Sequence, residues 1–195
     1  MSFEQFRKDY PTFEYKSYDI DESAEKINIA YHFTTDGLTE FTPRWTFKKP
    51  TDENFSDNPV FRRMIFSLGM VELVSYWKAT CSPTVVVSAG YLDERQKSWW
   101  KKLYWGGLGE FFYVNGIDTD FDEFMRIETT GEEICGDGRK VSEGGNLISI
   151  GGGKDSIVSL ELLSEMKDEN YCYIINPRGA TASSAKMAGY SGDRI

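Results

Sequence analysis

Polar and apolar residues alternate through KINIAYHFTTDGLTEFTPRWTFKK, residues 26–49, on both sides of the dipeptide Asp36-Gly37. This period of two is typical of strands with one buried face, and an Asp-Gly pair readily adopts the positive φ angles of a tight hairpin turn. The pattern therefore predicts two hairpin strands, at about 26–34 and 39–48.

Helical spacing replaces this alternation after the polar loop TDENFSDNPV. Asn58 is a good helix cap, and Pro59 suits the first helical turn because its missing N–H costs nothing there. We predict a helix over about 59–79 that is central to a core. Its apolar stripe is expected to contain Phe61, Met64, Ile65, Leu68, Val71 and Val74, and to be widened by Phe66, Met70, Leu73 and Trp77.

Three further patterns complete the N-terminal part. TVVVSAG, residues 84–90, is typical of a buried strand, and DERQKSWWKKLYW, residues 93–105, is an amphipathic helix that runs into the glycine-rich stretch GGLGEFFYVNGID. TTGEEICGDGRKVSEGG, residues 129–145, is rich in glycine and charge and is the predicted domain boundary. We expect an α+β domain over 1–143 and a second domain over 144–195.

The second domain begins with NLISI, a glycine-rich turn, KDSIVSLELLSEMK and YCYIINP. This order of strand, turn, helix and strand suits a right-handed crossover between parallel neighbours. The predicted fold class is therefore α/β, with the start of a parallel sheet after the boundary. Two strands cannot cover both faces of a parallel sheet, so the sheet is expected to be incomplete. We expect either a truncated or split version of a longer enzyme, or a second chain that completes the sheet.

Composition narrows the functional classes. The 195 residues are 40% hydrophobic and 15% aromatic, which is enough for a packed core, and the formal charge of -9 argues against an extended nucleic-acid-binding face. Cys81, Cys135 and Cys172 are odd in number and lack CxxC spacing, so neither a disulfide scaffold nor a zinc site is indicated. We find no membrane span and no signal peptide, and expect a reducing cytoplasm.

The stretch ISIGGGKDSIVSLELL carries the most specific chemistry. A strand that turns directly into a helix presents unpaired N–H groups at an electropositive end. Gly151, Gly152 and Gly153 let the backbone wrap a phosphate, and Lys154 adds a cation. The next two residues, Asp155 and Ser156, can cap the helix or contact a magnesium ion or a phosphate oxygen.

Two common phosphate motifs are absent. A Walker A loop would need glycine at position 148, which is Ile148, and Ser or Thr after Lys154, where Asp155 stands. A dinucleotide fingerprint would need glycine at position 156 and an acidic residue about 20 positions later, but the chain has Ser156 and Asn176.

GGGKDS instead resembles the SGGxDS pyrophosphate loop of the ATP pyrophosphatase, or PP-loop, family, whose members cut ATP between its α and β phosphates. The match covers Gly152, Gly153, Asp155 and Ser156, and departs at Gly151, where the family usually carries serine. The alternative is an ordinary strand-to-helix turn that is rich in glycine and capped by Asp or Ser. The resemblance implies that Gly151 to Ser156 bind ATP and that Asp155 orients Mg²⁺. It also implies that an adenine meets main-chain groups at the end of the second strand, at Ile175 and Asn176.

FSLGMVELVSYWKATCSP, WWKKLYWGGLGEFFYVNGID and SIGGGKDS together resemble the ATP-dependent epimerases of peptidoglycan precursor synthesis. This resemblance implies a UDP-N-acetylmuramoyl dipeptide substrate whose terminal L-Glu is adenylated and converted to D-Glu. It also implies roles in cell wall biogenesis, cell shape and cell division. The same loop would serve an amide or thiolation ligase, and a truncated, non-catalytic fragment is a further alternative.

Acid and base groups are less sharply indicated. Glu72 interrupts an apolar helical face that it shares with Tyr76, and Glu110 lies between GGLG and FFY, in surroundings expected to be apolar. We take Glu72 and Glu110 as the catalytic candidates. The simpler structural alternatives are that Glu72 is a buried or rim carboxylate paired with an arginine and that Glu110 is a surface group at a helix end. Lys78, Cys81 and His32 are weaker candidates, each with a structural role as the simpler reading.

Overall fold

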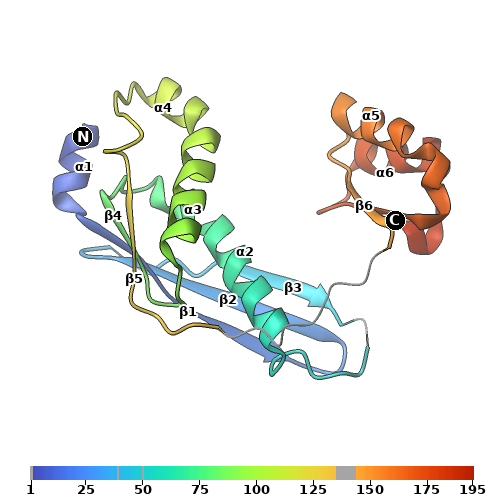
Figure 1. Cartoon of the computed structure of the whole chain (residues 1–195), viewed down its shortest axis with the longest axis horizontal. Coiled ribbons are helices and arrows are strands. Elements are labelled where there is room, and N and C mark those ends of the chain that lie inside the picture. Colours follow the sequence, from blue (N-terminus) through green and yellow to red (C-terminus); the bar gives the residue numbers. More distant parts are fainter. Residues whose placement is uncertain (1, 39, 50, 135–143) are drawn as a thin grey trace. The chain divides into compact units, whose positions relative to one another are not determined.

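The computed structural model describes residues 2–38, 40–49, 51–134 and 144–195. The chain divides into two compact units, Met1–Gly138 and Arg139–Ile195, here called the N-terminal and C-terminal units (Figure 1). Each unit has its own hydrophobic core. No helix within the described ranges has the length and hydropathy needed to cross a bilayer.

The N-terminal unit is built on a five-stranded mixed sheet in the order β3-β2-β1-β4-β5. Strands β1, β2 and β3 are antiparallel neighbours, whereas β4 runs parallel to β1 and β5 runs parallel to β4. The strand bounds are β1 Thr12–Glu22, β2 Lys26–Thr35, β3 Arg44–Lys48, β4 Thr84–Val87 and β5 Arg126–Thr129.

The predicted hairpin is confirmed by the antiparallel pairing of β2 with β3, and Gly37 has the expected positive φ of 82°. However, β3 begins at Arg44 rather than near residue 39. Pro43 has no N–H to donate, so among the described residues just before β3 the ladder consists of the bridge between Phe33 and Phe41 and a bond from the Tyr31 N–H to the Pro43 carbonyl.

In the described part of this unit, four helices accompany the sheet, namely α1 Phe3–Asp9, α2 Pro59–Trp77, α3 Glu94–Gly107 and α4 Gly109–Asn115. Helix α2 packs on β1 and β2, and α3 packs on β5 (Figure 1). The predicted cap of α2 is confirmed, since the Asn58 side chain accepts hydrogen bonds from the N–H groups of Val60 and Phe61.

The predicted apolar stripe of α2 is wrong in part. Met64 and Val71 are 62% and 53% exposed, although both were expected to face the core. The side chains expected only to widen the stripe form its centre instead. The buried residues of the helix are Ile65, Phe66, Gly69, Met70, Leu73 and Trp77.

A close approach at Gly69 explains why this face of the helix is the buried one. A Cβ added at Gly69 would lie 2.1 Å from the Tyr15 hydroxyl oxygen, so the tyrosine ring occupies the space beside the helix backbone. The same ring stacks on Phe66, with centroids 5.8 Å apart. Glycine therefore allows the helix to meet the sheet along this face.

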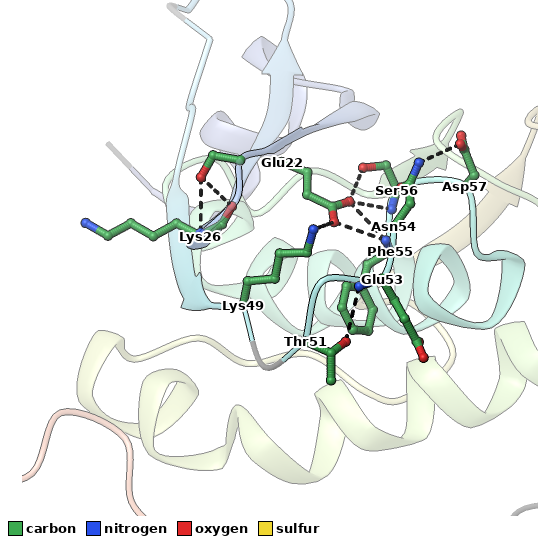
Figure 2. A network of polar contacts seen from close by, with 10 residues as sticks. Glu22, Lys26, Lys49, Thr51, Glu53, Asn54, Phe55, Ser56 and Asp57 are labelled. Carbon is green, nitrogen blue, oxygen red and sulfur yellow. Dashed lines mark hydrogen bonds and ion pairs between the residues drawn. The ribbon is translucent and has the colours of Figure 1, made fainter.

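An ion pair between two side chains that are each 9% exposed ties the end of β1 to the loop before α2 (Figure 2). The Lys49 Nζ atom lies 2.8 Å from Glu22 Oε1, and Glu22 Oε2 accepts hydrogen bonds from the N–H groups of Phe55 and Ser56 at 3.0 and 2.8 Å. Hydrogen bonds from Lys49 and then from Ser56 lower the pKa of Glu22 to about 2. The ionised carboxylate thus holds this loop in place.

The C-terminal unit follows the predicted order of strand, turn, helix and strand. Strands β6 (Asn146–Ser149) and β7 (Asn170–Tyr173) are parallel, as expected, and α5 (Lys154–Leu162) joins them. A 3-10 segment, η1 (Ser164–Glu169), precedes β7, and α6 (Gly179–Met187) follows it. A second short 3-10 segment, η2 (Gly192–Arg194), ends the unit. Its small core contains Ile148, Ile150, Leu160, Cys172, Ala185 and Tyr190.

Candidate functional site

The turn between β6 and α5 is shaped by Gly152. This residue has a φ of 82°, and an added Cβ would lie 3.1 Å from the Thr181 backbone nitrogen and 3.3 Å from the Ala180 carbonyl carbon. The turn therefore packs directly against the first turn of α6. At Gly151 the nearest atom to an added Cβ is 3.9 Å away, and at Gly153 nothing lies within 4 Å.

A buried serine fixes the path of this turn. Ser156 is 7% exposed, and its Oγ accepts a hydrogen bond of 2.9 Å from the Gly151 N–H. The sequence suggested that this hydroxyl contacts a phosphate. In the structure its oxygen already accepts from this turn, and the hydroxyl proton can still be donated to a phosphate oxygen.

The first turn of α5 presents its polar groups to solvent. Lys154 and Asp155 are exposed, and the cap residue Gly153 has no side chain that could bond to the N–H groups of this turn. Unpaired N–H groups at a helix start favour an anion, and the lysine adds a positive charge beside them. The geometry suits a negatively charged group.

A hollow of about 490 Å³ opens at the carboxyl ends of β6 and β7. Its lining comes from both strand ends and from the start of α6, and comprises Ser149, Ile150, Gly151, Tyr173, Ile175, Asn176, Arg178 and Thr181. Ile175 and Asn176, which the sequence placed near an adenine, both belong to this lining. Crevices at the carboxyl edge of parallel strands are where open α/β sheets bind ligands.

Arg178 and Thr181 were not singled out from the sequence. The Arg178 N–H donates to Thr181 Oγ1 at 3.0 Å, and this bond forms the start of α6 beside the glycine turn. A usable signal was present, because both loops follow strands predicted to be parallel and so were bound to meet at one edge. Arg178 adds a second cation to the site.

The described residues include no group of three or more His, Cys, Asp or Glu side chains that could hold a metal ion by themselves. Magnesium often binds through one or two carboxylates together with substrate phosphates. The exposed carboxylate of Asp155 fits that mode, in which phosphates supply the other ligands.

Glu72 lies in the N-terminal unit, part-way buried on α2. Its Oε1 accepts a hydrogen bond of 2.8 Å from the Trp45 indole N–H. The observed partner is therefore a neutral ring and not the arginine expected for a purely structural carboxylate. Tyr76, one turn later, stacks on Phe33 with centroids 5.5 Å apart. Glu72 is thus held in a defined position.

Glu110 is exposed in the first turn of α4. The prediction that Glu110 has apolar surroundings, made from its neighbours GGLG and FFY, is therefore wrong. The adjacent Phe112 is buried and packs against Trp105, with ring centroids 5.4 Å apart. The carboxylate of Glu110 is left to solvent because successive helical residues point in different directions.

Lys78 and Cys81 line another hollow of about 540 Å³, formed by α1, the end of α2 and the end of α4. Cys81 is buried, with a φ of 52°, and burial raises the pKa of its thiol to about 11. The thiol is therefore neutral near pH 7, which makes it a poor nucleophile or base. Lys78 Nζ lies 5.7 Å from the Phe111 ring centroid.

His32 bridges two carboxylates on the sheet face opposite α2. Its Nε2 lies 2.8 Å from Asp19 Oδ2, and its Nδ1 contacts Glu40. The hydrogen bond to Glu40 is the main cause that raises the pKa of His32, followed in the same direction by Asp19 and opposed by partial burial. This is the environment of a surface cluster of one imidazole and two carboxylates.

Comparison with known proteins points to one family. A family model described as the MurL N-terminal domain matches residues 4–193, a range that runs through both units. No solved structure matches the chain.

Three curated relatives carry the name UDP-N-acetyl-alpha-D-muramoyl-L-alanyl-L-glutamate epimerase. The protein from Micromonospora sp. is 30% identical over 197 residues, which cover 97% of this chain and 42% of the relative. That from Salinispora tropica is 30% identical, with 91% and 38% covered, and that from Xanthomonas oryzae pv. oryzae is 31% identical over 96 residues, with 49% and 21% covered. The chain spans less than half the length of these relatives.

Proposed function

Because this chain belongs to the MurL N-terminal domain family, we propose that it forms part of an epimerase acting in peptidoglycan precursor synthesis. The reaction converts the terminal L-Glu of UDP-N-acetylmuramoyl-L-alanyl-L-glutamate to D-Glu. The names of the relatives support the substrate, and the strand-to-helix turn of the C-terminal unit supports the dependence on ATP.

ATP solves a specific chemical problem in this reaction. The α-proton of a carboxylate is weakly acidic because its removal places a second negative charge beside the first. Transfer of AMP from ATP to the glutamate α-carboxylate releases pyrophosphate and removes the carboxylate charge. The α-proton then leaves, a proton returns on the opposite face, and water cleaves the acyl-adenylate to give D-Glu and AMP.

The observation that carries this proposal is the turn of Gly151 to Gly153, which bends around Gly152 and borders the hollow at the ends of β6 and β7. Its backbone and the start of α5 would hold the departing pyrophosphate, with Lys154 supplying positive charge. Asp155 would hold Mg²⁺ together with phosphate oxygens, and the metal would neutralise phosphate charge. Ile175 and Asn176 would contact the adenine ring.

Glu72 and Glu110 remain our candidates for moving the α-proton. Glu72 has the positioning that a base requires, since the Trp45 indole orients its carboxylate at 2.8 Å. The exposed Glu110 has the freedom to reach a bound substrate but lacks a fixed orientation.

The two-stranded sheet leaves apolar side chains uncovered. Leu147 is exposed on β6, and Tyr171 and Tyr173 are exposed on β7. Register places Leu147 beside Tyr171, so these residues share one face. We include in the proposal that further strands, from a longer version of the protein or from a second chain, complete this sheet.

Two isotope measurements test the function. The epimerase requires pyrophosphate exchange into ATP that depends on the dipeptide substrate, together with solvent deuterium at the glutamate Cα. Exchange without deuterium would favour an adenylating ligase, and the absence of both would favour a non-catalytic role.

Variants of the turn test the phosphate site. Lys154→Ala and Asp155→Ala should each weaken ATP binding more than about tenfold in the presence of Mg²⁺, since each removes a charged contact. Calorimetric titration measures this affinity. Lys186→Ala removes an exposed lysine from α6 and serves as the control. Equal affinities in all three variants and the unaltered chain would contradict the assignment.

A further inference from the structure

A crevice in the N-terminal unit lies at the carboxyl ends of the parallel strands β4 and β5. The backbones that follow these strands pack tightly, since a Cβ added at Gly131 would lie 2.5 Å from the Gly90 nitrogen and 2.5 Å from the Ser88 oxygen. Thr129 Oγ1 also donates to the Gly90 carbonyl at 2.9 Å. Sequence analysis predicted a strand and a helix here and no functional role. The epimerisation chemistry proposed above uses no residue of this crevice.

Two neighbouring hollows occupy this crevice. The inner one is about 150 Å³ and is bordered by Phe66, Tyr91 and Trp100, while the outer one is about 360 Å³ and adds Trp99 and Arg95. Asp93, Gln96 and Trp100 belong to both linings, so the hollows are adjacent. The inner volume is below the roughly 300–1,000 Å³ of drug-sized sites, so it suits a single ring.

The lining combines aromatic surfaces with hydrogen-bonding groups. Trp99 and Tyr91 are 57% and 48% exposed, and Trp99 meets the buried Trp100 edge-on with centroids 4.8 Å apart. Contact with this buried neighbour restricts the orientation of the Trp99 ring, while more than half of its surface stays exposed. Exposed aromatic surface of this kind is what single nucleobases stack on, because every base has a π-face.

The polar groups suit the edge of a pyrimidine. Gln96 Oε1 accepts from the Asp93 N–H, and Asp93 Oδ1 accepts from the Gln96 N–H, so both side chains are fixed by the cap of α3. This arrangement leaves the Gln96 amide NH₂ as a donor and Asp93 Oδ2 as an acceptor. Uracil offers the complementary set, two carbonyl oxygens and one ring N–H. Arg95 in the outer hollow supplies a cation for a diphosphate.

We propose that this crevice binds the uridine diphosphate end of the substrate. The inference rests on the proposed function for the presence of a uridine nucleotide, and on the crevice for its position. The peptide end of the substrate then extends away from this anchor, and binding energy gathered at the nucleotide serves to position the glutamate that reacts.

Titration of the chain with UDP tests the site directly. UDP should bind, and Trp99→Ala should weaken its binding about tenfold or more, because loss of one stacking ring typically costs that much. Trp99→Phe retains an aromatic ring and should restore most of the affinity. Tyr113→Ala removes an 88% exposed tyrosine from α4, outside the crevice, and should bind UDP as the unaltered chain does. Circular dichroism checks that each variant is folded.

The outcomes separate this site from the ATP turn. UDP affinity should be unchanged by Lys154→Ala and by saturating ATP. Displacement of UDP by ATP, equal affinities for Trp99→Ala and Tyr113→Ala, or no UDP binding by a chain that binds ATP would each overturn the uridine site and leave the ATP proposal standing. Conversely, normal UDP binding with no ATP binding would overturn the ATP proposal alone.

Discussion

Replacement of Gly152 by alanine should destabilise the C-terminal unit locally. The φ of 82° at this residue is costly for any residue with a Cβ, and the new methyl would lie 3.1 to 3.3 Å from backbone and side-chain atoms of Thr181 and Ala180. Strain of this kind costs about 1–3 kcal/mol. The loss should concentrate in α6, because α6 is the element that the methyl would push away.

Hydrogen exchange of the amides over residues 179–188 measures this loss as a fall in the free energy of local opening. Gly151→Ala is the matched control, since its methyl would meet only Ser156 Oγ at 3.9 Å and its φ lies outside the positive region. Its protection should stay within about 0.5 kcal/mol of the unaltered chain. Equal protection in the two variants would refute the packing argument for Gly152.

A third variant separates structure from binding. Gly153 matches a glycine of the PP-loop pattern, and a Cβ added there would meet no atom within 4 Å, so Gly153→Ala places a methyl beside the proposed phosphate without disturbing α6. It should weaken ATP binding at nearly full stability. Retained ATP affinity in Gly153→Ala would count against the turn as a phosphate cradle.

Three further predictions concern the N-terminal unit. The pKa of Glu22 falls from 4.5 to about 2 on folding, so the stabilisation from its ionised carboxylate is full above about pH 4.5 and is lost as pH falls toward 2. The denaturant midpoints of Glu22→Gln and the unaltered chain should therefore converge as the pH is lowered. A difference that stays constant with pH would contradict this prediction. The pKa of His32 is raised from 6.5 on folding, chiefly by Glu40, so the stabilisation from its protonated ring is full below about pH 6.5 and is lost as pH rises through the folded pKa. In Glu40→Gln the denaturant midpoint should therefore change less with pH over this range than it does in the unaltered chain. If Glu72 or Glu110 moves the α-proton, Glu72→Gln or Glu110→Gln should lower deuterium incorporation at least about tenfold while pyrophosphate exchange persists; full incorporation in both variants would remove both from that role.

Local signals along the chain were sufficient for much of the fold. Asp36-Gly37 predicted the hairpin, Asn58 and Pro59 predicted the start of α2, and the order after residue 144 predicted a parallel pair. The central strand β1 was missed because a bulge between Tyr15 and Ser17 interrupts the period of two in its apolar and charged residues.

The candidate site divides in the same way. The residue types of GGGKDS indicated a phosphate turn because backbone freedom, charge and helix polarity act within a few residues. The contact of Gly152 with Thr181, the place of Arg178 at the hollow and the bond from Trp45 to Glu72 join residues that are 26 or more positions apart. Such contacts depend on which helix face packs and how strands align, as the burial of the α2 face that contains Gly69 shows. The sequence by itself thus determined the local elements and the chemical character of the turn. Only tertiary packing decided the neighbours of each side chain, because those are set by the closure of distant segments on a common core.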